Sequence, residues 1–157
     1  MLTARRPSVW SKDYEIEVDG RAVTTFRTSW WRTGGTFDVD GHEYTIRQNF
    51  WGVKYGMAMA DGTVVASADR VGRKNWTVEA EGRTLHFRRT SVWTGEQAMI
   101  EGDRVVGQIR RISWWRGGAT ADLPDLDPAL QVFVVAVVVT MWDNQASAAA
   151  ASSGGGA

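Results

Sequence analysis

The chain has 157 residues, a length that suits one domain with its own buried core, without help from disulfides or metal ions. Its formal net charge at pH 7 is zero, which removes the usual electrostatic basis for a nucleic-acid-binding protein. The sequence contains no cysteine, so disulfides and thiolate chemistry are excluded, and this composition suits a reducing cytoplasm.

Dipeptides of an acidic residue and glycine recur along the chain at a nearly constant interval. Asp19-Gly20, Asp40-Gly41 and Asp61-Gly62 are 21 residues apart, and Glu81-Gly82 and Glu101-Gly102 follow at intervals of 20. Asp-Gly between alternating apolar and polar runs predicts a β-hairpin, because a type I′ turn requires positive φ at both central residues. Glutamate fits that turn less well, so we expect another turn type at the last two positions.

The runs on both sides of these turns have the alternation of half-buried strands. Tyr14, Ile16 and Val18, for example, alternate with acidic residues before the first turn. Five hairpins give ten strands, and further strands are expected near Val9–Trp10 and Ala119–Ala121. The sequence therefore predicts an all-β barrel of 10–12 antiparallel strands in a hairpin meander.

The most apolar segment of the chain, Ala129–Trp142, follows the last predicted strand. Its 14 residues fall short of the ~20 that a membrane-spanning helix needs, and Asp127-Pro128 is a favourable helix start. A helix that is apolar on every side must be surrounded, and a barrel this wide needs filling. We therefore predict a central helix at about 128–145, with small inward residues such as Ala66, Ala68 and Ala80 leaving room for it.

These elements predict a single domain over residues 1–145. Residues 146–157 are a low-complexity stretch of alanine, serine and glycine, for which we expect a disordered tail, apart from a frayed helical extension through Ala151. The N-terminus has basic residues without an apolar run behind them, so it is not a secretory signal.

The barrel of Asp-Gly hairpins closed by an apolar C-terminal helix resembles the tubby C-terminal-like superfamily. That superfamily includes the tubby domain, the LURP-one-related proteins, the phospholipid scramblases and many small bacterial members. The resemblance covers about Trp10 to Gln145, and its most telling parts are the segment Asp125–Ala136 and the repeated Ser-Trp-Trp-Arg segments. It implies a twelve-stranded barrel around the helix. The scramblases' Pro-rich region, Cys-rich segment and acidic calcium loop are missing, and no cluster matches the tubby lipid site, so the resemblance implies a fold and no activity.

Tryptophan and arginine gather at the ends of the second strands of three hairpins. If these ends converge, tryptophan at an interface and arginine near phosphates would suit contact with a bilayer or a protein. The alternative is that arginine stacks on tryptophan as part of the barrel wall. The candidate surface comprises Trp31, Arg32, Arg88, Arg89, Arg110, Arg111, Trp115 and Arg116.

No catalytic, metal-binding or cofactor-binding constellation is visible in the sequence. His42 and His86 are the only histidines, and without cysteine they offer no metal-ligand spacing, so we expect structural roles, with His42 facing inward. The serines of the repeated segments have no nucleophile motif around them. Asp122, Asp125 and Asp127 lack the glycine and the terminal glutamate of a calcium loop.

These observations predict a non-enzymatic binding or scaffold protein in the cytoplasm, in peripheral contact with anionic lipid or a protein partner and without nucleic acid. Two alternatives remain open. One is a carrier of a small apolar ligand, which requires an empty barrel with the helix outside it. The other is a membrane-anchored domain that uses the C-terminal apolar segment, although Asp143 would then have to enter the hydrocarbon.

Overall fold

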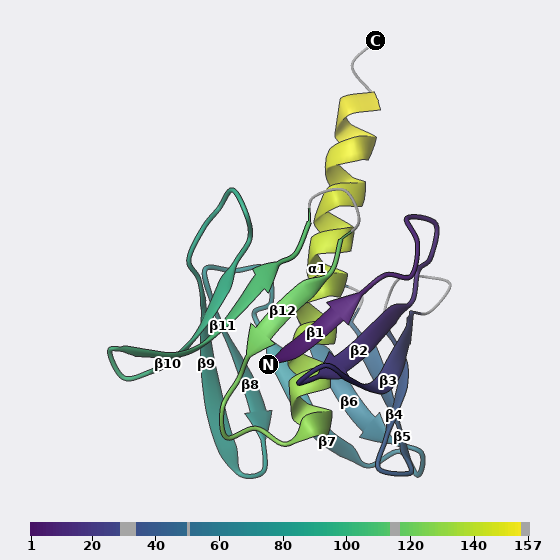
Figure 1. Ribbon diagram of the computed structural model, residues 1–157. Helices are drawn as coiled ribbons and strands as arrows, with labels where there is room; N and C mark the ends of the chain where they lie inside the picture. Colours follow the sequence, from purple (N-terminus) through teal and green to yellow (C-terminus); the bar gives the residue numbers. More distant parts are fainter. Residues whose placement is uncertain (29–33, 50, 114–116, 155–157) are drawn as a thin grey trace.

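The computed structural model describes residues 1–28, 34–49, 51–113 and 117–154. Within these ranges the chain forms twelve strands followed by one helix (Figure 1). The elements in chain order are β1 (Leu2–Arg5), β2 (Tyr14–Val18), β3 (Arg21–Thr28), β4 (Gly34–Val39), β5 (His42–Gln48), β6 (Tyr55–Met59), β7 (Val64–Asp69), β8 (Asn75–Ala80), β9 (Arg83–Arg89), β10 (Gln97–Glu101), β11 (Arg104–Arg111), β12 (Ala119–Asp122) and α1 (Pro128–Gly154).

Each strand pairs with its sequence neighbours in antiparallel fashion, and β1 pairs with β12 to close the barrel. The closure places Leu2 opposite Ala121 and Ala4 opposite Ala119, and all four side chains are buried. The predicted all-β barrel around a C-terminal helix is therefore confirmed. The strand expected at Val9–Trp10 was wrong: those residues form a turn, and the strand that begins the barrel is β1.

All five acidic-Gly dipeptides lie at hairpin connections. Both residues have positive φ at Asp19-Gly20 (50° and 79°), as a type I′ turn requires, and the same holds at Asp40-Gly41 and at Glu81-Gly82. The expectation that glutamate would avoid this conformation was wrong at Glu81, because pairing of the flanking Ala80 and Arg83 fixes a two-residue loop. At Asp61-Gly62 and Glu101-Gly102 only the glycine has positive φ, so these turns are of other types.

Every second hairpin carries a β-bulge next to its turn. The register shifts between β2 and β3, between β6 and β7, and between β10 and β11 leave Val23, Val65 and Val106 as the extra residues. A bulge bends its strand and increases the local twist, which a sheet needs in order to close. The regular spacing of the bulges therefore distributes the curvature around the barrel.

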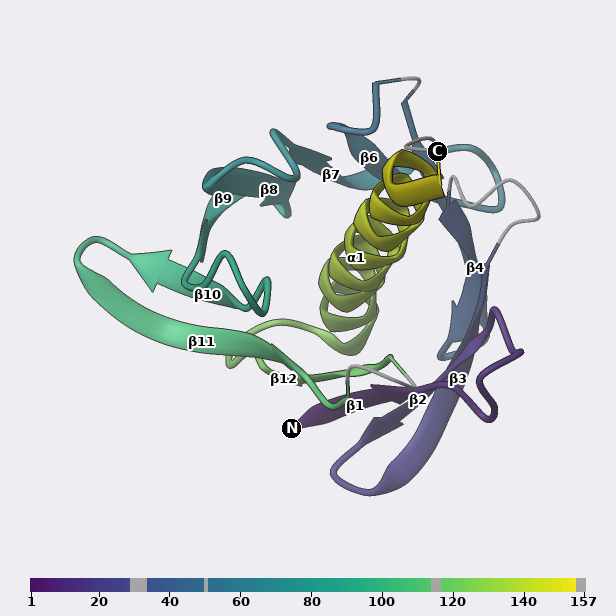
Figure 2. The ribbon, with the colours of Figure 1, turned by 90° about the horizontal axis from the view of Figure 1, so that it is seen from above.

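Helix α1 lies inside the barrel, with strands around it in the view along its axis (Figure 2). It begins where the sequence predicts, because Oδ1 of Asp127 accepts a hydrogen bond from the Leu130 N–H at 2.8 Å. All its residues from Val132 to Trp142 are buried, and Ala66, Ala68 and Ala80 face them from the wall. The helix thus fills a barrel that is too wide for its own side chains to fill, and the barrel buries a helix that is apolar on all sides.

The C-terminal boundary of the helix was predicted wrongly. α1 continues to Gly154 rather than ending near Gln145, so the helix also runs beyond the extension through Ala151 that the sequence suggested. Alanine has the highest helix propensity, and a helix already nucleated inside the barrel propagates at little cost. The last turns project from the open end of the barrel (Figure 1).

Candidate functional site: the tryptophan rim

Three exposed tryptophans stand at one end of the barrel, on three different connecting segments. Trp10 lies between β1 and β2, Trp51 between β5 and β6, and Trp93 between β9 and β10. Their exposed fractions are 90%, 79% and 84%. Because each connection runs from an odd to an even strand of an antiparallel barrel, all three lie at the same end, where α1 emerges (Figure 1). We call this end, with its described connecting residues 6–13, 49, 51–54, 70–74, 90–96, 112–113 and 117–118, the rim.

Although the chain has no net charge, the basic and acidic residues of its connecting segments are concentrated at opposite ends of the barrel. Among the described rim residues there are six basic side chains against two acidic ones, Asp13 and Glu96. The basic residues are Arg6, Lys12, Lys54, Arg70, Arg73 and Lys74. The connections at the other end carry seven acidic residues and no basic one: Asp19, Asp40, Asp61, Glu81, Asp103, Asp125 and Asp127. An anionic surface would therefore attract the rim.

Consecutive residues of α1 contact the barrel near the exposed tryptophans. The first of these residues is Trp142. Its indole N–H donates to the carbonyl oxygen of Gly95 at 3.0 Å, in the segment that carries Trp93. The Arg111 guanidinium stacks over the Trp142 ring at 4.4 Å from the centroid and donates to the Thr94 carbonyl at 2.7 Å. The segment between β9 and β10 is thus fixed to the helix from two sides.

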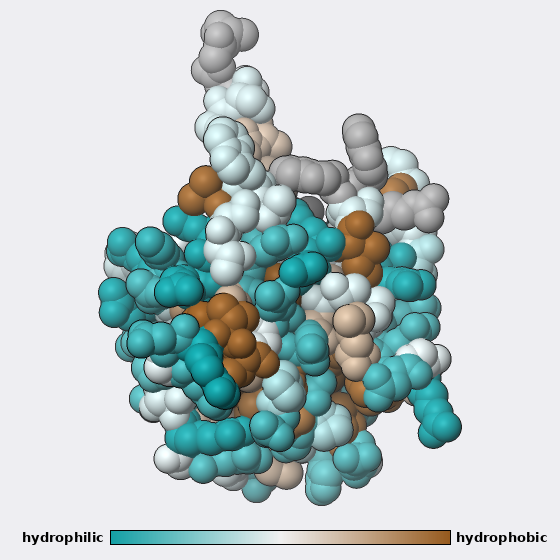
Figure 3. All heavy atoms as spheres, turned by 60° about the vertical axis from the view of Figure 1, so that its left-hand side comes forward, coloured by the Kyte–Doolittle hydropathy of each residue, from teal (hydrophilic) through white to brown (hydrophobic). Residues whose placement is uncertain are grey.

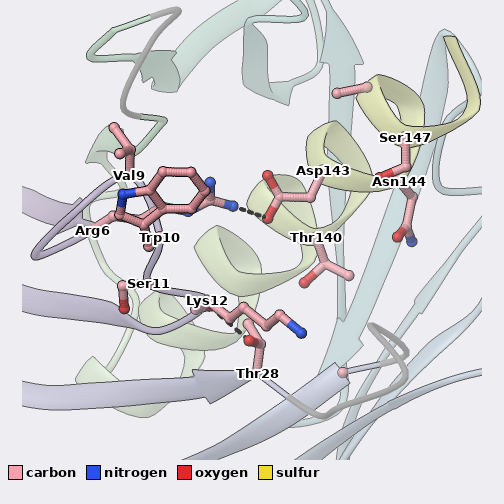
Figure 4. A pocket seen from close by; sticks show the side chains of 12 residues that line it. Arg6, Val9, Trp10, Ser11, Lys12, Thr28, Thr140, Asp143, Asn144 and Ser147 are labelled. Carbon is pink, nitrogen blue, oxygen red and sulfur yellow. Dashed lines mark hydrogen bonds and ion pairs between the residues drawn. The ribbon is translucent and has the colours of Figure 1, made fainter. Parts of the chain in front are cut away.

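Asp143 makes the corresponding contact with the segment between β1 and β2, which carries Trp10. Its Oδ2 lies 2.8 Å from the Arg6 guanidinium (Figure 4). The same oxygen accepts a hydrogen bond from the Tyr14 hydroxyl at 3.0 Å. The Arg6 guanidinium also lies over the Tyr14 ring, 5.0 Å from its centroid. This three-residue cluster is half-buried, so its charge pair is less screened by solvent than an ion pair on the open surface.

Asn144 extends the same arrangement to the third tryptophan. Its amide donates to the side-chain oxygen of Gln48 at 3.3 Å, at the end of β5 and shortly before Trp51. We call Trp142, Asp143 and Asn144 the hub. Trp142 and Asp143 contact two of the segments that present an exposed tryptophan, and Asn144 contacts the strand end that leads into the third. The hub fixes the positions of these segments relative to one another and to the helix axis.

A cleft of about 380 Å³ opens at the rim between the Trp10 segment and the emerging helix (Figure 4). Arg6, Trp10, Lys12 and Asn144 are among its lining residues. The Nε atom of Arg6 is buried and has no hydrogen-bond partner among the described residues. The cleft thus combines an aromatic ring, two cationic side chains and one unused donor.

Burial controls the acid–base behaviour of the two tyrosines at the hub. Desolvation raises the pKa of Tyr14, and the neighbouring Asp143 carboxylate raises it further. Desolvation also raises the pKa of Tyr55, against the effect of a hydrogen bond from Asn144. Both hydroxyls therefore stay neutral in the folded protein at a pH where the same groups ionise in the unfolded chain.

This difference predicts alkaline destabilisation. Because the folded-state pKa is raised, the stabilisation is fully present below the unfolded-state pKa of ~10 and is lost as the pH rises above it. We expect the free energy of unfolding, measured by urea titration at a series of pH values, to fall steeply above about pH 10. The double variant Tyr14→Phe with Tyr55→Phe should show a clearly shallower fall, and an unchanged slope would contradict this account.

The structure brings only part of the predicted candidate surface into view. Trp31, Arg32, Trp115 and Arg116 lie outside the described residues. Arg88 and Arg110 are exposed on the outer wall, and Arg89 and Arg111 are half-buried near the rim. The Arg111 guanidinium stacks over the ring of Trp142, which belongs to α1 and not to one of the repeated strand segments.

The remaining sequence-based predictions concern the two histidines, possible metal ligands and Asp127. His42 is exposed, so the expectation that it is buried inside the barrel was wrong: it shares the face of Tyr44 and Ile46, but as the first residue of β5 it lies beside the Asp40-Gly41 turn at the end of the barrel. His86 is exposed as well. Among the described residues there is no group of three or more potential metal ligands. Asp127 caps α1, as its position before the helix implied.

Sequence reasoning missed the three exposed tryptophans, although a signal was present. Trp10, Trp30 and Trp51, and then Trp93 and Trp114, follow one another at intervals of 20 or 21 residues. This is the interval of the acidic-Gly turns, shifted by half a repeat. Because half a repeat is one strand, the shift places Trp10, Trp51 and Trp93 at the end of the barrel opposite the turns, while Trp30 and Trp114 lie outside the described residues.

No protein-family model, curated protein or solved structure matches this chain. The resemblance to the tubby C-terminal-like superfamily therefore stays a prediction, and the case for function depends on the geometry of the rim.

Proposed function

We propose that this protein is a non-enzymatic binding module that attaches peripherally to the surface of anionic membranes through its tryptophan rim. The observation that supports this proposal most is the presence of Trp10, Trp51 and Trp93, all highly exposed, on three segments at one end of the barrel. Tryptophan is the side chain most typical of the boundary between water and lipid, because its large apolar ring carries one polar N–H.

The charges of the rim favour the same partner. Six described basic side chains surround the tryptophans, and each lysine or arginine near an anionic leaflet contributes about 1 kcal/mol of attraction. The acidic end then faces away from the bilayer, so electrostatic attraction and tryptophan insertion select one orientation. Beyond Asp143 the described part of α1 has no charged side chain, so it can point at the membrane without burying a charge.

The two alternative functions have less support. A carrier of an apolar ligand needs an empty lumen, whereas α1 lies in the lumen of this barrel. A membrane anchor needs the apolar segment in lipid. α1 is long and apolar enough to cross a membrane by length and composition, yet 61% of its most apolar window is buried inside the protein. Such burial is typical of a core helix in a soluble protein.

Co-sedimentation with lipid vesicles tests the proposal. We expect the protein to bind vesicles that contain phosphatidylserine and to bind pure phosphatidylcholine vesicles much more weakly, with a loss of binding as salt increases. The triple variant Trp10→Ala, Trp51→Ala and Trp93→Ala should bind at least about a hundredfold more weakly. Each ring needs to remove only ~60 Å² of apolar surface from water to contribute about 1.5 kcal/mol, or about tenfold.

A matched control removes exposed apolar side chains from the other end of the barrel. Val23, Val64 and Val105 are exposed beside the acidic turns, and their replacement by alanine should leave vesicle binding unchanged. Unfolding midpoints of both triple variants close to that of the unsubstituted protein would show that the fold is intact. Equal binding by the two triple variants, or binding that ignores anionic lipid, would rule out the proposed function.

A further inference from the structure

A groove of about 540 Å³ crosses the outer wall of the barrel over β8, β9 and β10. Figure 3 turns this side of the molecule toward the viewer and shows a mostly hydrophilic wall around a patch of apolar side chains. Five residues with hydrogen-bonding side chains line the groove: Arg70, Asn75, Thr77, His86 and Arg88. Asn75 is opposite Arg88 and Thr77 is opposite His86 across the β8–β9 pair, so four of the five stand on adjacent positions of one sheet surface.

These five side chains have no partners in the part of the chain that the structure describes. Among the described residues, none of them makes a side-chain hydrogen bond, and neither arginine takes part in an ion pair. No carboxylate lines the groove. The nearest acidic residue by register is Asp69, opposite Thr77, and its Oδ1 accepts a hydrogen bond from the Arg70 N–H at 2.8 Å. The groove is therefore a concave surface with two arginines that take part in no ion pair among the described residues.

The backbone holds Arg70 at the edge of this groove in an unfavourable conformation. Its φ is 60°, in the left-handed region that glycine, asparagine and aspartate adopt more readily than arginine. The adjacent Val71 is buried, and its N–H donates to the Val53 carbonyl at 3.0 Å. The Arg73 N–H closes the turn by donating to the Arg70 carbonyl at 3.1 Å. Such strain at a fixed, exposed cationic residue is typical of positions that serve a ligand.

We propose that this groove binds a phosphate monoester. Guanidinium groups present a planar fork of N–H donors that matches phosphate oxygens, and phosphate has enough acceptor oxygens to engage several donors at once. Arg70 and Arg88 supply the charge, while Asn75, Thr77 and His86 supply further donors from one side. The absence of a lining carboxylate disfavours a cation. The groove shares Arg70 with the rim, whereas Asn75, Thr77, His86 and Arg88 lie on β8 and β9, and the proposal does not depend on the membrane contact of the tryptophans.

The two histidines of the chain allow a direct test by proton NMR. His86 lies in the groove, whereas His42 lies beside the Asp40-Gly41 turn at the opposite end, so its resonance is an internal reference. We expect titration of the full-length protein with glycerol 3-phosphate to displace the His86 ring resonance in a saturable way and to leave His42 in place. Glycerol alone should displace neither. Equal displacement of both histidines, or no saturable displacement of His86, would overturn the proposal.

Single substitutions locate the binding groups. Arg70→Ala and Arg88→Ala should each raise the dissociation constant for glycerol 3-phosphate about tenfold or more, because each removes a charge-assisted bond to the ligand. Arg47→Ala is the matched control, since it removes the same charge from an exposed strand position outside the groove. An unchanged affinity in Arg70→Ala and Arg88→Ala, or an equal loss in Arg47→Ala, would overturn the proposal.

A vesicle experiment then decides whether the phosphate belongs to a lipid or to a soluble molecule. A preference for phosphatidic acid over phosphatidylserine vesicles that is lost in Arg88→Ala, alongside loss of glycerol 3-phosphate binding, would identify a lipid headgroup as the source. Unchanged vesicle binding in the same variant, with glycerol 3-phosphate binding lost, would support the site with a soluble ester as its ligand. The triple tryptophan variant should retain glycerol 3-phosphate binding, which separates this inference from the proposed function.

Discussion

A chain truncated after Asp127 is expected to show no cooperative unfolding transition, because α1 supplies the side chains that fill the barrel. All residues from Val132 to Trp142 are buried, and each large apolar side chain among them contributes about 1.5–3 kcal/mol. The net stability of a domain is only about 5–15 kcal/mol, so the strands cannot compensate for the loss of the helix. Near-ultraviolet circular dichroism during thermal unfolding measures this directly.

The helix itself offers the control for that truncation. A chain that ends after Gln145 keeps the buried part of α1 and the hub and loses only the projecting turns. We expect it to unfold cooperatively, with a midpoint close to that of the full chain. A truncation after Asp127 with a cooperative, near-native transition would show that the strands form a stable barrel without their filling.

Phe133→Ala is expected to destabilise the fold by about 3–5 kcal/mol, the largest effect we predict for a single substitution. Phe133 is fully buried in the part of the helix that lies deepest in the barrel. The surrounding strands form a closed ring, so they can move inward little to fill the cavity. Urea unfolding measures the change, and Phe133→Leu should cost much less because it keeps most of the volume. A loss below about 1 kcal/mol for Phe133→Ala would contradict tight packing around the helix.

The fold could be predicted because its signals are local. Each acidic-Gly dipeptide specifies a turn, and the alternation beside it indicates which face of a strand is buried. The helix position followed from Asp127-Pro128 and from the mutual need of barrel and filling. The element boundaries were harder to predict. β1 has only four residues, too few to show an alternating pattern. The helix continues beyond its apolar segment because the alanines that follow favour helix.

The candidate site was harder to predict because it depends on which residues meet at one end of the barrel. The repeated segments drew attention to paired tryptophans on strands, whereas the exposed rings belong to connecting segments such as the one with Trp93. Arg111 belonged to the predicted candidate surface, although in the structure it stacks on Trp142. Contacts such as Asp143 with Arg6 and Tyr14 join residues more than a hundred positions apart, and no local pattern contains them.

The position of α1 also determines when the chain can fold during synthesis. The helix follows all twelve strands in the chain, and β1, the first strand, pairs with β12, the last. Ribosomes release chains from the N-terminus, so β1 waits for its partner until nearly all of the domain has been made. Until α1 emerges, the growing sheet exposes an apolar inner face and two unpaired edges, which are typical sites of aggregation. In the cell, the nascent chain therefore has to be protected from misassociation until its last element is available.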